Sequence, residues 1–358
     1  MKYYGVIMAG GGGTRFWPLS RQKTPKQLLN LSGKDYMVNE AIDRLAQVVE
    51  RDNIYIVTSA VQAEAMRRVT EGKIPAENIL AEPAARNTAA CIGYAAVELL
   101  RRKGDGVMII TPADHCITDV PALAEIFRKA VKAAEAGENL VTIGLKPTFP
   151  STGFGYIRYD AAIEGDVKPV LAFREKPDEE TAKQYVESGE YAWNSGMFIW
   201  KAGLILEKLK EYVPDIYGEI TKIGDAVGTE NEQAVLHAVY PGIRKISVDY
   251  AVMEPAAADG DVLVIPGECG WNDVGSWDMM NILHEEDENG NIFLGDVLGI
   301  DVKDSVVYSS NRTVTVLGVD GLVVVETPDA VMVCRKDRAQ DVKKIVDTLN
   351  EAGRKELL

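Results

Sequence analysis

Residues 3–15 read YYGVIMAGGGGTR, an apolar run followed at once by four consecutive glycines. A short apolar run of this kind is typical of a buried strand. Glycine lets the backbone approach a ligand closely, and successive backbone N–H groups can form a concavity that binds phosphate. The stretch therefore predicts a first buried strand that leads directly into an anion-binding loop.

The spacing of the glycines disfavours two common nucleotide sites. The dinucleotide fingerprint G-x-G-x-x-G would need glycine at position 15 or 16, where Arg15 and Phe16 stand, and the P-loop pattern G-x-x-x-x-G-K-[S/T] is absent. An NAD-type dehydrogenase and a P-loop NTPase are therefore disfavoured. A tight turn is the alternative, but four glycines exceed what a turn needs and carry a large backbone entropy. Because Arg15 adjoins them, a phosphate site is favoured.

Charge is distributed unevenly along the chain. The 358 residues include 39 Lys and Arg against 54 Asp and Glu, a net charge of −15. Such acidity argues against a generic binder of nucleic acid or of anionic membranes. Residues 1–34, however, contain no acidic side chain, so the cationic excess coincides with the glycine cluster and supports a site for a small anion. The cations of this segment are Lys2, Arg15, Arg21, Lys23, Lys26 and Lys34.

The order of elements predicts an α/β fold. Apolar runs of strand length alternate with helical patterns, which is typical of a mostly parallel sheet covered by helices on both faces. We expect strands at Tyr3–Met8, Asn53–Thr58, Asn78–Ala81, Gly106–Thr111, Leu140–Leu145, Phe154–Tyr159, Val170–Phe173, Met197–Trp200 and Asp261–Pro266. We expect helices at Val38–Glu50, Val61–Glu71, Asn87–Lys103, Pro121–Ala136, Asp178–Ser188, Ala202–Tyr212, Glu230–Tyr240 and Ser276–His284.

The composition changes near the C-terminus. After the polar connector 285–291, the segment Ile292–Val333 is rich in Val, Gly and Thr and has no helical period, which predicts a short β-solenoid or meander. An amphipathic helix follows at Asp337–Glu351. Because roughly 150 residues make one domain, we expect two, at 1–284 and 285–358. The apolar β-rich tail makes a homodimer possible.

The cysteines and the N-terminus indicate a reducing compartment. Cys91, Cys116, Cys269 and Cys334 are scattered, a spacing that fits neither a zinc site nor a disulfide framework. We therefore expect free thiols. The first apolar run is too short for a membrane span and lacks the h-region of a signal peptide. We expect a cytoplasmic protein that binds no membrane.

Two aspartates follow predicted strands, where ligands bind in open α/β sheets. Asp114 comes after the apolar strand Gly106–Thr111, which we expect to be central, and Asp273 stands in a glycine-bearing turn. A carboxylate at such an edge can bind Mg²⁺ beside a phosphate. The alternative role for each aspartate is helix capping. For the helix after Asp114, Asp119 is the better cap candidate. For Asp273 taken alone, a helix cap fits better than a metal ligand. We assign no chemical role to His115.

Further polar residues suggest contacts with a phosphate or a sugar. Lys26 is a candidate second phosphate contact, although its spacing from the glycines is weak support. Gly155 offers open backbone beside an aromatic ring, and Asn194 can bind a hydroxyl group. Glu175 can accept from sugar hydroxyls and Lys176 can meet a phosphate, but a surface ion pair is equally consistent. No Ser/His/Asp or Cys/His set stands out, so the pattern favours metal-assisted phosphoryl or nucleotidyl transfer.

Taken together, eight stretches resemble the sugar-nucleotide pyrophosphorylases, most closely the mannose-1-phosphate guanylyltransferases. The resemblance covers nearly the whole chain, and the eight stretches occur in the family's order. They are Ala9–Leu19 with Pro25-Lys26-Gln27, Glu82–Ala89, Thr111–His115, Gly153–Ile157, Phe173–Pro177, Trp193–Phe198, Ser247–Glu254 and Trp271–Trp277.

The resemblance implies a GT-A-like, Rossmann-type nucleotidyltransferase domain with a mixed, mostly parallel sheet, followed by a small left-handed β-helix-like domain. It also implies roles for individual residues. Guanine recognition falls to Gly10 and to Glu82, Arg86, Asn87 and Thr88; the GTP phosphates to Gly11, Gly12, Gly13, Thr14, Arg15 and Lys26; Mg²⁺ to Asp114 and Asp273; mannose to Gly155, Glu175 and Asn194; and the sugar phosphate to Lys176. Asp249 is expected to be structural support.

The implied reaction is the synthesis of GDP-mannose. A phosphate oxygen of mannose 1-phosphate attacks the α-phosphorus of GTP in line and releases pyrophosphate. Residue chemistry alone leaves open another pair of NTP and hexose 1-phosphate. It also leaves open a non-catalytic nucleotide-sugar sensor, although the intact cations and carboxylates disfavour one. Some relatives carry a second, phosphomannose isomerase domain; this sequence ends at Leu358, so we expect a single activity.

Overall fold

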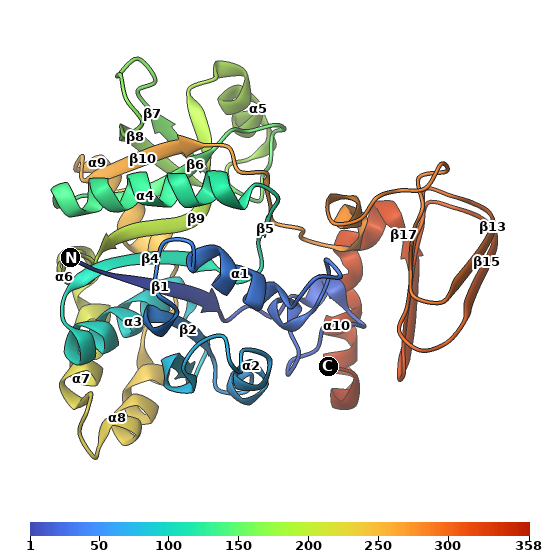
Figure 1. The fold of residues 1–358 in the computed structure, drawn as a ribbon, viewed down its shortest axis with the longest axis horizontal. Coiled ribbons are helices and arrows are strands. Elements are labelled where there is room, and N and C mark those ends of the chain that lie inside the picture. The colour runs from blue at the N-terminus through green and yellow to red at the C-terminus, as the bar shows by residue number, and fades with distance from the viewer.

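The computed structural model describes residues 1–358 and has a nine-stranded sheet, followed by a smaller group of strands near the C-terminus (Figure 1). The strand order is β3-β2-β1-β4-β9-β6-β10-β8-β7, so β1 and β4 lie inside the sheet. This arrangement confirms the expected α/β class with a mixed sheet. The strands are β1 (Lys2–Ala9), β2 (Ile54–Ser59), β3 (Ile79–Glu82), β4 (Gly106–Pro112), β6 (Leu140–Leu145), β7 (Gly155–Tyr159), β8 (Lys168–Glu175), β9 (Tyr191–Lys201) and β10 (Val262–Gly267).

Helices cover both faces of the sheet, which explains why β1 is apolar from Tyr3 onwards. Successive side chains of a strand point to opposite faces. Val6 accordingly packs in one core with α3, α6 and α7, and Ile7 packs in the other with α1 and α4. No helix combines the length and the apolar character needed to cross a lipid bilayer. The helices are α1 (Met37–Leu45), α2 (Ala63–Val69), α3 (Asn87–Lys103), α4 (Val120–Ala136), α5 (Glu179–Ser188), α6 (Ala202–Tyr212), α7 (Pro214–Ala226), α8 (Glu232–Val239) and α9 (Glu254–Ala258).

The sheet is less parallel than the alternating pattern predicts. β3, β2, β1 and β4 pair in parallel, as do β6 and β10. β9 enters between β4 and β6 antiparallel to both, and β7 and β8 are antiparallel to their neighbours. The loop between β7 and β8 is too short for the helical crossover that a parallel pair requires, so it joins an antiparallel pair.

Several elements differ from the sequence-based expectation, three of them in ways that affect the site or the core. Helix α7 was not expected, because Pro214 opens it and two internal glycines weaken its helical pattern. β9 begins at Tyr191, six residues before the expected strand, because Asn194, Ser195 and Gly196, which line a cavity, interrupt its apolar pattern. The segment expected to be a helix from Ser276 is instead the 3-10 turn η7 (Trp277–Ile282).

The C-terminal strands wind as a solenoid, one of the two arrangements expected. β12 (Ile292–Leu294), β14 (Val306–Ser309) and β16 (Leu322–Thr327) pair in parallel, one strand from each successive turn of the chain. β13 (Val297–Lys303) and β15 (Val314–Asp320) form a second parallel pair. A meander would pair these strands antiparallel. Only the last strand, β17 (Ala330–Arg335), reverses direction.

A third hydrophobic core joins this C-terminal unit to the loop that follows β1. Phe16 and Trp277 pack there with Val306, Val325 and Val342. The last helix, α10 (Val342–Glu351), lies against the 3-10 turn η1 (Thr14–Phe16). The indole N–H of Trp17 donates to the carbonyl oxygen of Leu357 at 2.8 Å. The loop after β1 is therefore packed against the C-terminal end of the chain, whereas the N-terminus lies at the opposite end of β1 (Figure 1).

At the end of β3, Glu82 is buried although it carries a carboxyl group. It is 6 % exposed, and the hydroxyl of Tyr240 donates to its Oε1. Burial raises the pKa of Glu82 to about 7, even though the hydrogen bond from Tyr240 acts in the opposite direction. Ionisation of Glu82 at neutral pH therefore opposes folding.

The burial of Glu82 should make the free energy of unfolding depend on pH. The pKa of Glu82 rises from 4.5 to about 7 on folding, so the protein loses stability as pH rises through that window. We expect Glu82→Gln, whose amide oxygen can still accept from Tyr240, to be more stable than the wild type by about 2–3 kcal/mol at pH 8 and by much less at pH 5. Urea unfolding at both pH values measures this, with the exposed Glu77→Gln as control. An equal pH dependence in wild type and Glu82→Gln would contradict the assignment.

Candidate active site

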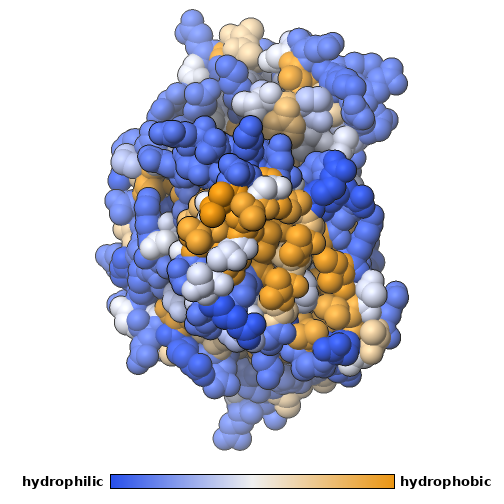
Figure 2. Space-filling view, turned by 90° about the vertical axis from the view of Figure 1, so that its right-hand side faces the viewer, coloured by the Kyte–Doolittle hydropathy of each residue, from blue (hydrophilic) through white to orange (hydrophobic).

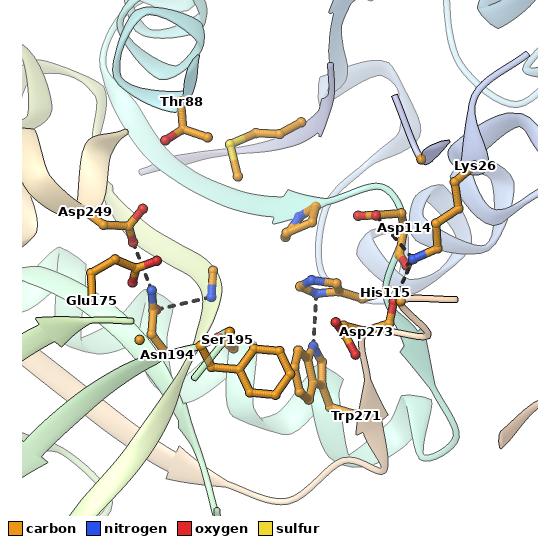
Figure 3. A pocket seen from close by; sticks show the side chains of 18 of the residues that line it. Lys26, Thr88, Asp114, His115, Glu175, Asn194, Ser195, Asp249, Trp271 and Asp273 are labelled. Atoms are coloured by element: carbon orange, nitrogen blue, oxygen red, sulfur yellow. Dashed lines mark hydrogen bonds and ion pairs between the residues drawn. The ribbon is translucent and has the colours of Figure 1, made fainter. Parts of the chain in front are cut away.

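A cavity of about 560 Å³ opens where β1 and β4 end (Figure 3). Its lining comes from segments far apart in the sequence: the loop after β1, the loop after β4, the polar half of β9, the turn after β10 and the helix α10. Ligands of open α/β sheets bind at this edge. Of the residues singled out from the sequence, those that line it are Gly13, Thr14, Arg15, Lys26, Thr88, Asp114, Gly155, Glu175, Asn194 and Asp273.

The end of the glycine loop is shaped by close contact with Lys26. Gly13 adopts a φ of 56°, which disfavours other residues, and a Cβ there would overlap the Cβ of Lys26 and lie 2.8 Å from its backbone nitrogen. Glycine is therefore required for the loop to pass over Lys26. Gly10, Gly11 and Gly12 are exposed and lie outside the lining of the cavity.

The ammonium of Lys26 holds two of the other segments together. Its Nζ donates to the backbone carbonyl of Asp114 at 2.7 Å, to Oδ2 of Asp114 at 3.2 Å and to the backbone carbonyl of Asp273 at 2.6 Å. Lys26 is only 4 % exposed, so these three acceptors use all three of its protons in a buried place. A direct phosphate contact by Lys26 would have to replace one of these bonds.

The two aspartates that Lys26 connects have opposite pKa shifts. Burial alone would raise the pKa of Asp114, but the charge of Lys26 holds it below its ordinary value. The pKa of Asp273 is raised, chiefly by burial and also by the negative charge of Asp114, although Lys26 acts against this. Two carboxylates thus meet at the cavity with a single buried cation to offset them.

Sequence reasoning gave no role to His115, which the structure places in the cavity beside these carboxylates (Figure 3). The indole N–H of Trp271 donates to Nδ1 of His115 at 3.0 Å. An indole nitrogen can only donate, so Nδ1 must accept, and the neutral ring carries its proton on Nε2. Burial lowers the pKa of His115 to about 4, so the ring is neutral at physiological pH. Its position next to Asp114 was the only signal in the sequence.

At the other end of the cavity, two carboxylates surround an amide (Figure 3). The amide of Asn194 donates to Oδ1 of Asp249 at 2.9 Å, and its oxygen accepts from the backbone N–H of Gly196 at 3.1 Å. Burial and the nearby charge of Asp249 raise the pKa of Glu175. Oε2 of Glu175 is buried without a hydrogen-bond partner, and a Cβ at Gly155 would clash with it. Asp249, expected only as structural support, also lines the cavity.

Lys176, next to Glu175, lies outside the lining of this cavity. It adopts a φ of 47°, and its side chain is 59 % exposed. Its Nζ forms an ion pair with Oε1 of Glu175 at 3.1 Å, the surface pair that the sequence left open. A sugar phosphate could be reached only if Lys176 turned away from Glu175.

The segment expected to recognise guanine reaches the cavity only at Thr88, whose hydroxyl accepts from the backbone N–H of Val248. Asn87 accepts from the backbone N–H of Thr88, and Arg86 donates to the carbonyl of Pro241. A Cβ at Gly10 would lie 3.3 Å from Oε2 of Glu82, so those two expected base contacts adjoin each other outside the main cavity.

One positioning residue was not singled out from the sequence. The side-chain amide of Gln27 donates to the carbonyls of Ala9 at 2.7 Å and Gly11 at 3.0 Å. It therefore ties the glycine loop to the segment that carries Lys26. Its place directly after Lys26 was the available signal.

Comparison with known proteins agrees with this architecture. A family model described as nucleotidyl transferase matches residues 4–290, and one described as MannoseP isomerase/GMP-like beta-helix domain matches residues 295–349. The chain is 42 % identical to the mannose-1-phosphate guanylyltransferase of Escherichia coli K12, covering 99 % of this chain and 75 % of that protein. It is 39 % identical to the alginate biosynthesis protein AlgA of Pseudomonas aeruginosa PAO1, covering 98 % and 73 % respectively.

Solved structures give the same result. A crystal structure from Thermus thermophilus, described as a mannose-1-phosphate geranyltransferase, superposes with a TM-score of 0.87 at 34 % identity and covers 98 % of this chain and 100 % of that one. These similarities extend over the sheet, the cavity and the C-terminal solenoid, and they confirm the resemblance seen in the sequence. The chain belongs to the nucleotidyl transferase family and, within it, to the mannose-1-phosphate guanylyltransferases.

Proposed function

We propose that this chain makes GDP-mannose and pyrophosphate from GTP and α-D-mannose 1-phosphate. The observation that carries the proposal is one cavity with two chemically different ends. One end has the turn with Arg15 and the carboxylates of Asp114 and Asp273; the other has the unpartnered Oε2 of Glu175 beside Asn194. The first end suits a nucleotide phosphate chain with a divalent cation, and the second suits the hydroxyl groups of a sugar.

On this proposal, the sugar end binds by hydrogen bonding. Oε2 of Glu175 is a buried acceptor without a donor, which is costly unless a ligand supplies one. A sugar hydroxyl is such a donor, and the oxygen of Asn194, held by Asp249 and Gly196, is a second acceptor. Lys176 is assigned to the sugar phosphate, which would draw its ammonium away from Glu175.

The phosphate end is assigned to the nucleotide. A phosphate oxygen of the sugar 1-phosphate forms a bond to the α-phosphorus of GTP while the bond from that phosphorus to the bridging oxygen breaks, and pyrophosphate leaves with the electron pair. Arg15, which has no ion-pair partner, offsets the charge of the leaving group. Backbone groups of Gly11, Gly12, Gly13 and Thr14 are assigned to the phosphates, and Gly10, Glu82, Arg86, Asn87 and Thr88 to the base.

The carboxylates fit a bound Mg²⁺. Their oxygens are ligands that Mg²⁺ prefers. The pKa of Asp273 is raised, chiefly by burial and also by the charge of Asp114, so a bound cation would favour its ionised form. No group of three or more His, Cys, Asp or Glu side chains surrounds a possible metal position. Mg²⁺ commonly takes one or two carboxylates and completes its shell with water and substrate phosphates. When bound, it neutralises phosphate charge. Lys26 would keep the segments of Asp114 and Asp273 together.

The proposed reaction predicts a specific pair of substrates. With Mg²⁺, we expect pyrophosphate release to be fastest with GTP and mannose 1-phosphate among all combinations of the four NTPs and a panel of sugar 1-phosphates. Steady-state release measured for each pair tests this. A higher kcat/KM for another pair would reassign the substrates, and binding of GDP-mannose without turnover of any pair would indicate a sensor.

Loss of one carboxylate should separate metal dependence from folding. We expect Asp273→Asn to lower kcat by about 10²–10³-fold, because a charged group that stabilises the reacting phosphates is lost. We also expect Mg²⁺ to stop enhancing the protection that GTP gives against thermal unfolding. The control is Asp52→Asn, an exposed carboxylate outside the cavity. A variant with near-normal Mg²⁺-dependent rates would remove Asp273 from the site.

We also propose that the chain forms a homodimer through its C-terminal strands. Figure 2 shows a continuous apolar area on the side of the molecule where β13, β15 and β17 lie. A large exposed apolar patch of this kind marks an interaction surface. Its exposed side chains are Leu298, Ile300, Leu317, Val331 and Val333.

A charge in this patch should dissociate the dimer. We expect Leu298→Asp to elute as a monomer in size-exclusion chromatography with light scattering while the wild type elutes as a dimer, because a carboxylate cannot be buried unpaired between two copies. The matched control is Leu171→Asp on β8, since Leu171 is 53 % exposed and Leu298 56 %. A monomeric wild type would contradict the proposal.

The proposal also covers the cellular compartment and the roles of the two domains. We infer a cytoplasmic location, supported by four free cysteines of which three are buried. We assign the nucleotidyltransferase domain to residues 1–284 and the small β-rich domain, which carries the dimer contact, to residues 285–358.

A further inference from the structure

One cation of the cavity comes from the C-terminal unit. Lys343 stands in the first turn of α10 and lines the same cavity as Arg15 and Lys26. In the sequence it is separated from the glycine loop by more than three hundred residues. The expected set of site residues did not include it.

The core of the protein sets the position of Lys343. The preceding residue, Val342, is fully buried in the core that also holds Phe16. Ile345, Val346 and Leu349 pack against that core from the same helix. Phe16 ends η1, the turn that carries Arg15, so α10 and the glycine loop are fixed against each other (Figure 1).

A bound anion would favour the placement of Lys343, whose side chain is exposed near the start of a helix. A cation near a helix N-terminus is unfavourable, because the helix dipole is positive there. Lys344 stands in the same turn but is compensated by Asp341 at 2.7 Å. Lys343 has no carboxylate partner. Lys343 is therefore an exposed cation that lines the cavity without a counterion.

The three lining cations of the cavity differ in whether their charge is already paired within the protein. Lys26 uses its three protons on the segments of Asp114 and Asp273. Arg15 and Lys343 are the lining cations without an ion pair. Both belong to the part of the lining formed by η1 and α10, whereas Glu175 and Asn194 belong to β8 and β9.

We propose that Lys343 binds the terminal phosphates of the nucleotide and the pyrophosphate that leaves, so that α10 completes the active site. The inference rests on the proposed function and adds a binding residue to it. An ammonium without a protein partner is a point charge suited to phosphate oxygens that carry several negative charges. The docking of the C-terminal unit is then a requirement for nucleotide binding.

Binding measurements can locate the contact along the phosphate chain. Lys343→Met removes the charge and keeps the length of the side chain, and Lys344→Met in the same turn is the matched control. By isothermal titration calorimetry, we expect Lys343→Met to raise the Kd for GTP and for inorganic pyrophosphate about tenfold, which corresponds to about 1.4 kcal/mol. The Kd for GMP, which lacks the terminal phosphates, should change by less than about twofold. Lys343→Arg should restore most of the affinity, and Lys344→Met should match the wild type.

Each other outcome has a distinct meaning. If Lys343→Met binds GTP and pyrophosphate as the wild type does, the phosphate role of Lys343 is wrong while the proposed function stands. If GMP binding falls as much as GTP binding, the contact is not to the terminal phosphates and the proposal is overturned. A wild type that binds neither GTP nor pyrophosphate would overturn both. Equal thermal unfolding midpoints of the ligand-free variants show that folding does not cause the difference.

Discussion

The buried ammonium of Lys26 is the interaction on which the geometry of the cavity depends. It joins the segment after the glycine loop to the carbonyls of Asp114 and Asp273, which lie far from it and from each other in the sequence. A buried charge is tolerated only when it is paired and hydrogen-bonded, so all three acceptors must be in place together. Gly13 has to be glycine for the loop to pass the backbone and the Cβ of Lys26. Loop, cation and carboxylates therefore form as one unit.

The protein leaves several groups of this cavity electrostatically unbalanced. Asp273 is buried near a second carboxylate, Oε2 of Glu175 has no donor, and Arg15 and Lys343 have no counterion. The buried oxygen of Glu175 is unfavourable in a ligand-free protein, whereas Arg15 and Lys343 are exposed cations that remain free to bind an anion. A divalent cation, a sugar and a phosphate chain would satisfy them together, which is the physical basis of the proposed reaction. The overall net charge of −15 has little bearing on it, because the cations gather locally.

The C-terminal unit is part of this arrangement. Its strands and α10 share a hydrophobic core with Phe16 and Trp277, and its last residues accept hydrogen bonds from the loop after β1. The surface at which two domains of one chain meet is often polar and mobile. Here it is a buried apolar core directly behind the proposed phosphate site, so movement of α10 would displace the turn that carries Arg15.

The sequence by itself determined the features that depend on neighbouring residues. The expected bounds agree with the structure for the apolar run of β1, for the helix α3 at Asn87–Lys103 and for the strand β6 at Leu140–Leu145. In these elements the spacing of apolar residues along the chain is enough to show which side chains are buried. The glycine loop, Lys26 and the two strand-end aspartates were also identifiable, since parallel strands bring their ends to one edge. The tertiary structure alone decided the antiparallel entry of β9, the proton position on His115 set by Trp271, and the place of Lys343 beside Arg15. Each of these depends on a partner far away in the sequence, and such a contact cannot be predicted from the spacing of apolar residues in one segment.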